Sequence, residues 1–401
     1  MVNTAFAVDA DTSQLRFSGF GTLGYIMDDH DQIAPIRDLG QKPDHGFRTG
    51  DSWEMDTRIG LQVDYRFSSK LEAVAQLVFR DQTVNSLDTW LQLAYFGINP
   101  SANWDVRLGR FGYDVFLMSD HRHLGYAYSW VRPPEEFYSG ITHYSMDGIE
   151  ATYKINTDEG HWRIKGQFGQ SKPMLAMGAS DYQADMHPIY SLTLTHETGS
   201  WRFKTGYSYY KINNEPAVLK GLHDNLLEQV SNLTIGDEAA SLLQNSKFSD
   251  ASKQFMSLGA AYDDGVWLGQ AEFGLSQTSN IIYSPIKSAY FVLGRRIGNF
   301  TPYVLLSAVR PRAHLVEPIN NWGARSGLQQ QAVYLVNSTR MDQESVSLGV
   351  RWDFHDQAAL KLQWTNSHIN KNGYSYWYRD IPLYNQDTRI NLLSASLDFA
   401  F

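Results

Sequence analysis

The sequence predicts an all-β fold, namely a transmembrane antiparallel β-barrel of about 16 strands with short turns at one end and long loops at the other. Three features predict it: period-two alternation of apolar and polar residues, connections that alternate in length, and aromatic residues at strand ends. The 401 residues include no cysteine, which excludes disulfides and thiolate metal sites. No linker or shift in composition divides the chain, so a single domain is expected.

The alternation is clearest between residues 58 and 67, where every second side chain is apolar. The apolar face there consists of Ile59, Leu61, Val63, Tyr65 and Phe67. Charged and polar residues fill most positions between them, and the pattern returns at 71–80, 162–168 and 346–354. No apolar run approaches the roughly 18–20 residues that a transmembrane helix needs, so any membrane crossing is expected to be by strands.

The connections between the alternating segments differ systematically in length. Short ones include 68–69, 198–199 and 298–299. The long ones are 28–52, 112–145, 171–187, 213–252, 313–342 and 367–388. A transmembrane barrel combines short periplasmic turns with long outer loops in this way.

Aromatic residues are frequent, with 11 Trp and 23 Tyr, and many tryptophans lie where a strand is expected to end. These are Trp53, Trp90, Trp104, Trp162, Trp201, Trp267 and Trp352. Such rings suit the bilayer interface. A soluble sandwich or barrel is the alternative, but it would hide its apolar face inside and seldom needs so many long strands.

Several segments resemble a known family. The segments 90–98 and 106–111 are similar to the strand pair that precedes the third loop of Gram-negative porins, with Phe111 in place of the usual Gln. Residues 292–303 and 347–354 are similar to later porin hairpins, and the last strand ends in Phe401, which resembles the family's assembly signal. The resemblance covers the strand framework and identifies no subfamily.

The resemblance implies a function and a location. It implies a homotrimer in the cell outer membrane, in contact with lipid and lipopolysaccharide, through which small hydrophilic solutes or ions diffuse passively. It implies no enzymatic activity, no cofactor and no nucleic-acid partner. Residues 1–7 are interpreted as a signal-peptide remnant and 8–401 as the barrel domain.

By the same resemblance, residues 112–145 form the loop that folds into the pore and narrows it. Its charged residues Asp114, Asp120, Arg122, Glu135 and Glu136 would face the barrel wall. The residues expected on the inward face of the wall include ten basic ones: Arg58, Arg80, Arg107, Arg163, Lys165, Arg202, Lys204, Arg296, Arg351 and Lys361. Basic residues outnumber acidic ones on the inward positions, so an anion-biased lumen is our hypothesis. The alternative is that these charged side chains only keep the lumen hydrated and pair with one another, without any selectivity for ions.

The outer loop 213–252 is expected to be partly helical. Apolar residues recur with a 3.6-residue period in 216–233, which indicates an amphipathic helix, and 236–245 fits a second short one. A lid on the barrel mouth or a contact with a neighbouring subunit are the roles expected for these helices.

The sequence offers weak signals for other functions. His121 and His123 form a close pair, but no third ligand stands at motif spacing, so no metal site is predicted. Ser119, Ser129 and these histidines offer no nucleophile with a base and an orienting group, so a barrel hydrolase is disfavoured. A channel specific for one small molecule, and a structural barrel without conductance, remain as alternatives.

Overall fold

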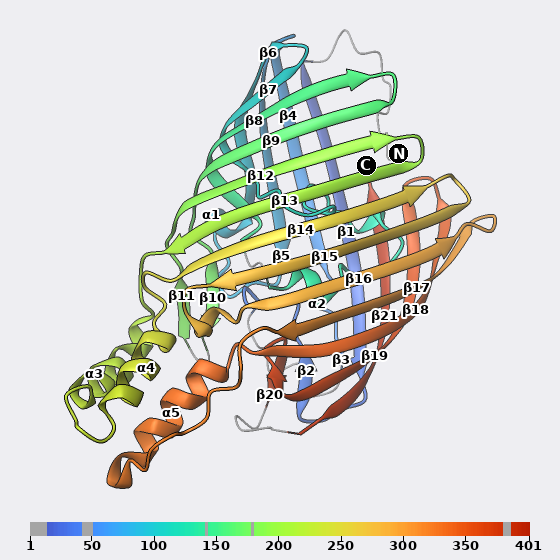
Figure 1. The fold of residues 1–401 in the computed structure, drawn as a ribbon. Helices are drawn as coiled ribbons and strands as arrows, with labels where there is room; N and C mark the ends of the chain where they lie inside the picture. The colour runs from blue at the N-terminus through green and yellow to red at the C-terminus, as the bar shows by residue number, and fades with distance from the viewer. Residues whose placement is uncertain (1–13, 42–50, 141–142, 178–179, 380–385) are drawn as a thin grey trace.

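A closed antiparallel barrel forms the body of the molecule (Figure 1). The computed structural model describes residues 14–41, 51–140, 143–177, 180–379 and 386–401, so the predicted signal remnant lies outside the described residues. The main sheet has 17 strands, of which β3 (Asp51–Ser52) is only two residues long, so 16 strands form the barrel. These are β1 (Leu15–Asp28), β4 (Arg58–Ser68), β5 (Leu71–Arg80), β6 (Leu91–Ser101), β7 (Trp104–Gly112), β8 (Ser145–Thr157), β9 (Gly160–Ser171), β12 (Met186–Thr198), β13 (Trp201–Ile212), β14 (Ser252–Asp263), β15 (Trp267–Thr278), β16 (Ile286–Arg295), β17 (Phe300–Pro311), β18 (Met341–His355), β19 (Ala358–Tyr374) and β21 (Thr388–Ala400). The predicted fold class and strand number are therefore confirmed.

The barrel closes where β1 pairs with β21 on one side and with β4 on the other, both antiparallel. The last residue takes part, since Gly19 and Phe401 exchange two backbone hydrogen bonds of 2.9 Å. The Phe399 ring lies over Gly21, where a Cβ atom would be 2.3 Å from the ring. A glycine beside an aromatic ring is thus what lets the two ends of the sheet approach closely.

The barrel is apolar outside and polar inside. Phe17, Leu192 and Leu258 point outward and are 70%, 56% and 63% exposed. Inward neighbours such as Ser394 and Lys361 are buried. A soluble protein has its apolar side chains inside, and this barrel has them outside. A bilayer requires that arrangement, because lipid takes the place of the protein interior as the partner of the apolar side chains.

The two ends of the barrel differ, as the loop lengths predict. We call the end with the C-terminus and the short connections the turn end, and the opposite one the loop end (Figure 1). Exposed aromatic residues surround the turn end, and neighbouring rings touch, as Trp201 and Tyr262 do at 4.8 Å between ring centroids. This is the position of an interfacial aromatic girdle.

The remaining elements lie at the loop end, except for helix α2 (Glu135–Tyr138), which lies inside the barrel. Two small sheets pair β2 (Ile33–Pro35) with β20 (Trp377–Arg379) and β10 (Met174–Met177) with β11 (Ser180–Gln183). The other helices are α1 (Leu87–Trp90), α3 (Lys220–Gln229), α4 (Gly236–Ser246) and α5 (Ser326–Asn337). No helix among the described residues has the length and apolar character needed to cross a membrane.

One long loop contains a helix that was not predicted from the sequence, and one predicted loop boundary is wrong. The long connection 313–342 joins β17 to β18 as expected and contains α5, whose apolar stripe buries Ala332 and Val336 against the neighbouring loop. The last loop was expected to start at Ser367, yet β19 continues to Tyr374 because Ile369 and Tyr374 pack inward in a cluster at the barrel mouth.

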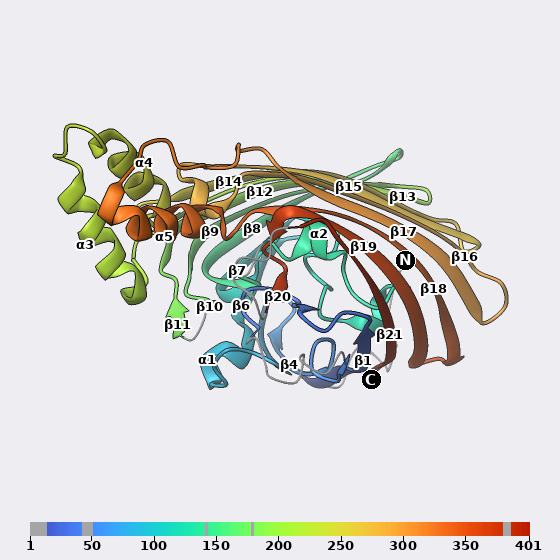
Figure 2. The ribbon, with the colours of Figure 1, turned by 90° about the horizontal axis from the view of Figure 1, so that it is seen from below.

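Helices α3, α4 and α5 pack together into a small helical unit beyond the loop end, as both views show (Figures 1 and 2). Its core includes Leu226 from α3, Leu242 from α4 and Val336 from α5. Glu238 on α4 connects the two loops. Its carboxylate accepts hydrogen bonds from Ile319 N (3.0 Å), Asn320 N (2.8 Å), Trp322 Nε1 (3.0 Å) and Gln329 Nε2 (2.7 Å).

Replacing Glu238 should loosen this unit. A Glu238→Gln side chain keeps one acceptor oxygen for four donors, so we expect the contact between α4 and α5 to weaken by roughly 1–3 kcal/mol. Faster hydrogen exchange in α5, with the barrel unchanged, would be the signature. Asp237→Asn, at the exposed neighbouring position, is the control. Equal exchange in the two variants would contradict this role of Glu238.

The same carboxylate makes the unit sensitive to acid. Burial alone would raise the pKa of Glu238, but its hydrogen bonds with Ile319, Trp322, Gln329 and Asn320 outweigh burial and lower the pKa to about 2 from an ordinary 4.5. The stabilisation is therefore complete above about pH 4.5 and is lost as the pH falls toward 2. Relative to the intrinsic exchange rate at each pH, the protection of amides in α5 should fall over that pH range in the wild type and much less in Glu238→Gln.

Candidate functional site

The candidate site is a cavity between the barrel wall and a loop that folds into the lumen. The loop leaves β7 after Gly112, runs inside the barrel and returns to β8 at Ser145. At its neck, the Tyr113 N–H donates to the Tyr144 carbonyl at 3.0 Å. We call residues 113–144 the inner loop.

Aromatic packing holds one side of the inner loop. Phe116 and Phe137 are 5.3 Å apart between ring centroids, and Phe116 lies 5.0 Å from Phe255 on β14. Phe137 also lies 5.2 Å from Tyr290 on β16. All four rings are buried, so the loop and an apolar core occupy the lumen beside β14–β16.

Two buried glutamates bind the same side of the loop to the wall. Glu272 on β15 accepts from Leu117 N at 2.8 Å, from the Tyr290 hydroxyl at 2.6 Å and from the Tyr138 hydroxyl. Glu136 in α2 accepts from Ser307 on β17 and Gln343 on β18, both at 2.8 Å, and from Ser345 on β18.

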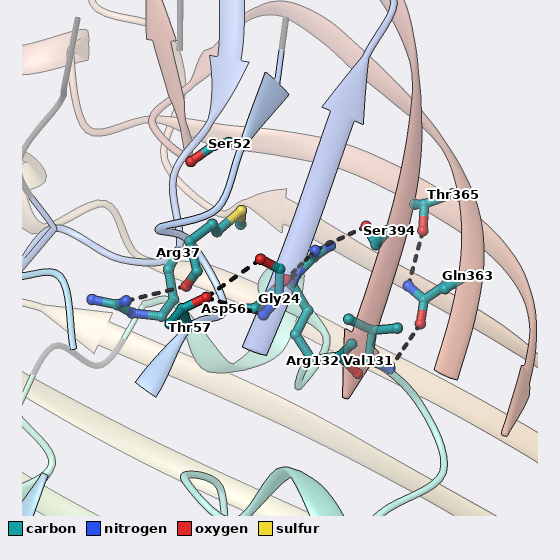
Figure 3. A network of polar contacts seen from close by, with 12 residues as sticks. Gly24, Arg37, Ser52, Asp56, Thr57, Val131, Arg132, Gln363, Thr365 and Ser394 are labelled. Carbon is teal, nitrogen blue, oxygen red and sulfur yellow. Dashed lines mark hydrogen bonds and ion pairs between the residues drawn. The ribbon is translucent and has the colours of Figure 1, made fainter. Parts of the chain in front are cut away.

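An arginine anchors the far part of the loop. Arg132 Nε donates to Asp56 Oδ1 at 3.0 Å, and its Nη2 donates to Ser394 on β21 at 2.9 Å (Figure 3). The figure also shows Val131 N directed at Gln363 of β19, at 3.2 Å. Arg132 and Asp56 are 6% and 2% exposed. A buried, bidentate ion pair of this kind fixes both position and orientation.

A lysine makes the next contact along the wall. Lys361 on β19 is fully buried and lies 3.0 Å from Asp398 on β21. Its ammonium donates to two loop carbonyls, Gly125 O at 2.6 Å and Trp130 O at 3.0 Å. The inner loop is thus bound to strands on several sides of the barrel, which makes it a fixed partition of the lumen.

The space left open lies on the other side of the partition. It is a cavity of about 500 Å³ between the inner loop and the wall from β4 to β13. Its lining includes seven cationic and four acidic side chains. These are Arg107, Arg122, Lys154, Arg163, Lys165, Arg202 and Lys204 against Asp105, Asp114, Asp120 and Glu150.

Most of the acids in the cavity already have a basic partner. Asp114 on the loop pairs with Lys165 at 2.7 Å and with Lys204 on the wall. Glu150 pairs with Arg107 at 3.0 Å, and Asp105 pairs with Lys154. Because cations exceed acids, pairing leaves a net positive charge on the cavity surface.

Arg163 and Arg202 illustrate this excess. Both guanidiniums contact one oxygen of Glu197 at 2.7 Å, and Glu197 is absent from the cavity lining. One carboxylate therefore balances the charge of only one of the two guanidiniums that face the cavity near the turn end.

Arg80 and Arg122 are held by an aromatic ring. Both guanidinium carbons lie over Tyr144, Arg80 at 4.0 Å and Arg122 at 3.6 Å from the ring centroid. Arg122 also donates to the His143 carbonyl at 3.1 Å and makes no ion pair within the described residues. Asp38, from the loop after β1, contacts Arg80 at 3.7 Å and accepts from the Tyr144 hydroxyl. Stacking keeps an arginine in place and leaves donors free for a solute.

The structure brings most of the predicted site residues together. Asp114, Asp120, Arg122, Arg107, Arg163, Lys165 and Arg202 line the main cavity. Arg58, Arg80 and Glu135 line a smaller one of about 40 Å³ that shares Arg122, His123 and Tyr144 with it. Glu136 lines neither of these two and binds the wall.

Some residues of the site did not emerge from the sequence. Tyr144, Asp38 and Asp56 position arginines, yet no alternation or motif marks them. Asp38 lies in a segment that was expected to be only an outer loop. Charge pairs between distant loops leave no local signal in a single sequence.

The histidine pair shows no metal-binding arrangement. Across the described ranges, no group of three or more His, Asp or Glu side chains is placed to hold a metal ion. His123 stacks on Tyr144 at 4.6 Å between ring centroids, and burial first, then nearby arginines, lower the pKa of His123.

Comparison with known proteins identifies the fold. No family model matches the sequence, and no curated protein sequence is similar to it. Solved structures that resemble the chain include OmpT of Vibrio cholerae, with TM-score 0.52 and 11% identity over 97% of this chain and 99% of that one. An anion-selective porin from Comamonas acidovorans gives TM-score 0.53 and 11% identity over 96% and 99%. Salmonella typhi OmpF, in a complex with daunomycin, gives a TM-score of 0.52 and 11% identity over 96% of this chain and 97% of that one. The chain therefore has the 16-stranded barrel fold of the porins.

The Arg132 anchor can be tested by breaking it in two ways. Arg132→Met leaves Asp56 buried without its partner, which should destabilise the attached loop by about 3–5 kcal/mol. Adding Asp56→Asn removes the orphaned charge and should restore much of the loss. Hydrogen exchange of the inner loop measures both effects. A double variant that exchanges as fast as Arg132→Met would contradict the ion-pair explanation.

Proposed function

We propose that the protein is an outer-membrane channel through which small hydrophilic solutes diffuse passively, with a preference for anions. The observation that carries the proposal is the excess of cationic over acidic side chains on the 500 Å³ cavity beside the inner loop. No step in this transport needs a cofactor or a chemical reaction.

The preference follows from electrostatics in a narrow, water-filled space. An elementary charge about 5 Å from an ion in water changes the energy of that ion by roughly 0.8 kcal/mol. The low-dielectric wall and the narrow gap strengthen the effect, which favours anions and disfavours cations. The acids of the cavity are largely neutralised by their partners, so they weaken this field only locally.

We propose that the inner loop is the constriction predicted for residues 112–145. Its anchors at Glu272, Glu136 and Arg132 support a fixed diameter rather than a mobile gate. The wall residues proposed to screen solutes are Arg58, Arg80, Arg107, Arg163, Lys165 and Arg202. On the loop, Asp114, Asp120, Arg122 and Glu135 line the two cavities, and Glu136 holds the loop in position.

The apolar outer face supports the proposed location. A continuous belt of exposed apolar side chains with aromatic residues at the turn end fits a bilayer, with outer-membrane lipid and lipopolysaccharide as neighbours. A homotrimer is proposed from the likeness of fold alone.

Selectivity can be measured as a reversal potential in a planar bilayer under a salt gradient. We expect the wild type to prefer anions. Arg122→Met should lower the anion-to-cation permeability ratio by roughly threefold or more, because it removes one charge from the cavity. Arg325→Met, at an exposed position on the outer helical unit, should leave the ratio unchanged.

The outcomes separate the alternatives. A clear cation preference would overturn the anion hypothesis, and folded protein without conductance would overturn the channel and favour a structural barrel. Blockade of the current by one solute at low concentration would indicate a substrate-specific channel. Hydrolysis of an ester or peptide by folded protein would indicate an enzyme instead.

A further inference from the structure

Behind the constriction lies a buried polar cluster with one cation, which plays no part in the proposed route. It consists of Tyr113 and His143 at the neck of the inner loop, Ser208 on β13 and Lys253 on β14, and we call it the neck cluster. Their exposed fractions are 2%, 2%, 0% and 4%. None of the four lines the main cavity.

Lys253 is a buried cation without a counter-charge. Among the described residues it makes no ion pair and no side-chain hydrogen bond. It faces inward on β14, beside its cross-strand partner Tyr210, which is also buried. Burying an unpaired ammonium costs several kcal/mol, so such a group normally has an anionic partner.

The groups around Lys253 are donors without partners. The Tyr113 hydroxyl, the Ser208 hydroxyl and both ring nitrogens of His143 are buried, and they have no hydrogen-bond partner in the described part of the chain. The His143 ring lies 4.2 Å from the Tyr113 ring and 5.1 Å from the Tyr210 ring, between centroids. The Ser208 hydroxyl lies next to the Tyr113 hydroxyl without the geometry of a full hydrogen bond; burial raises the pKa of Tyr113, and Ser208 and the charge of Arg122 lower it.

No carboxylate reaches this cluster. Burial first, and then the charges of Arg122 and Lys253, lower the pKa of His143 to about 3, so the imidazole is neutral and has one N–H to donate. The charged groups that act on Tyr113 and His143 are cationic, and no charged group among the described residues acts on Lys253. The two hydroxyls and the imidazole can each donate one hydrogen bond, and the neutral acceptor atoms beside them carry no charge that could balance the ammonium.

We propose that the neck cluster binds one small inorganic anion, such as chloride. An anion accepts from the hydroxyls, from the His143 N–H and from the ammonium at once, and it supplies the missing counter-charge. A water molecule could satisfy the hydroxyls but would leave the charge of Lys253 uncompensated. The bound anion would connect the neck of the inner loop to β13 and β14, and so stabilise the partition next to Arg122.

This site is independent of the proposed transport function, so it can be tested on its own. The direct experiment is anomalous diffraction from crystals of the full chain in which bromide replaces chloride. We expect a bromide peak within about 3.5 Å of Lys253 Nζ in the wild type and its loss in Lys253→Met. Bromide found only at other positions would overturn the proposal.

Stability in solution provides a second readout. At equal ionic strength, the wild type should melt a few degrees higher in chloride than in gluconate, because an anion that binds only the folded state stabilises it. Lys253→Met should lose this difference, while Lys287→Met, at an exposed position on β16, should keep it. The same chloride dependence in Lys253→Met and the wild type would also overturn the proposal.

If Lys253→Met fails to fold, His143→Phe takes its place. It keeps the ring contact with Tyr113 and removes one donor, so the chloride dependence should shrink. An undiminished dependence in that variant would count against the cluster, and the wild-type bromide peak decides the question without any variant.

Discussion

The structure depends on one constraint: a sheet that crosses lipid must satisfy all its backbone hydrogen bonds within itself, which only a closed ring of strands can do. Closure sets the inside and outside faces of every strand, so the spans have apolar side chains outward and, apart from the apolar core beside β14–β17, mostly polar ones inward. The lumen is consequently lined by groups that need partners. In this protein a loop supplies many of those partners.

The inner loop explains why the two halves of the lumen differ. Beside β14–β16, its aromatic residues meet Phe255 and Tyr290 and form a packed core inside the barrel. Beside β4–β13, it presents charged residues to a charged wall, and the space stays open. A single segment thus fills one half of the barrel and shapes the other.

The sequence was informative where structure is local. Period-two alternation predicted the strands and their faces from Arg58 to Phe67 and elsewhere, because every span meets the same two environments. The sequence was less informative where contacts join distant segments. Arg132 meets Ser394 across 262 positions and Leu117 meets Glu272 across 155, and neither pair leaves a periodic signal. Glu135 and Glu136 are adjacent, and a single sequence does not indicate that their roles differ. In the structure Glu135 lines the smaller cavity and Glu136 binds the wall.

These anchors also account for a positive cavity in a chain whose formal net charge is -9. Several inward or loop carboxylates are committed to holding the partition: Glu272 and Glu136 accept from backbone and hydroxyl donors, and Asp56 and Asp398 pair with Arg132 and Lys361. None of these four carboxylates lines the main cavity, and each is bound to hydrogen-bond donors or to a cation, so a solute in the open half of the lumen does not contact them. The cations of β7–β13 keep their access to it, and Arg122 on the loop faces them. The distribution of partners, rather than the total charge, therefore sets the sign of the potential that a solute meets.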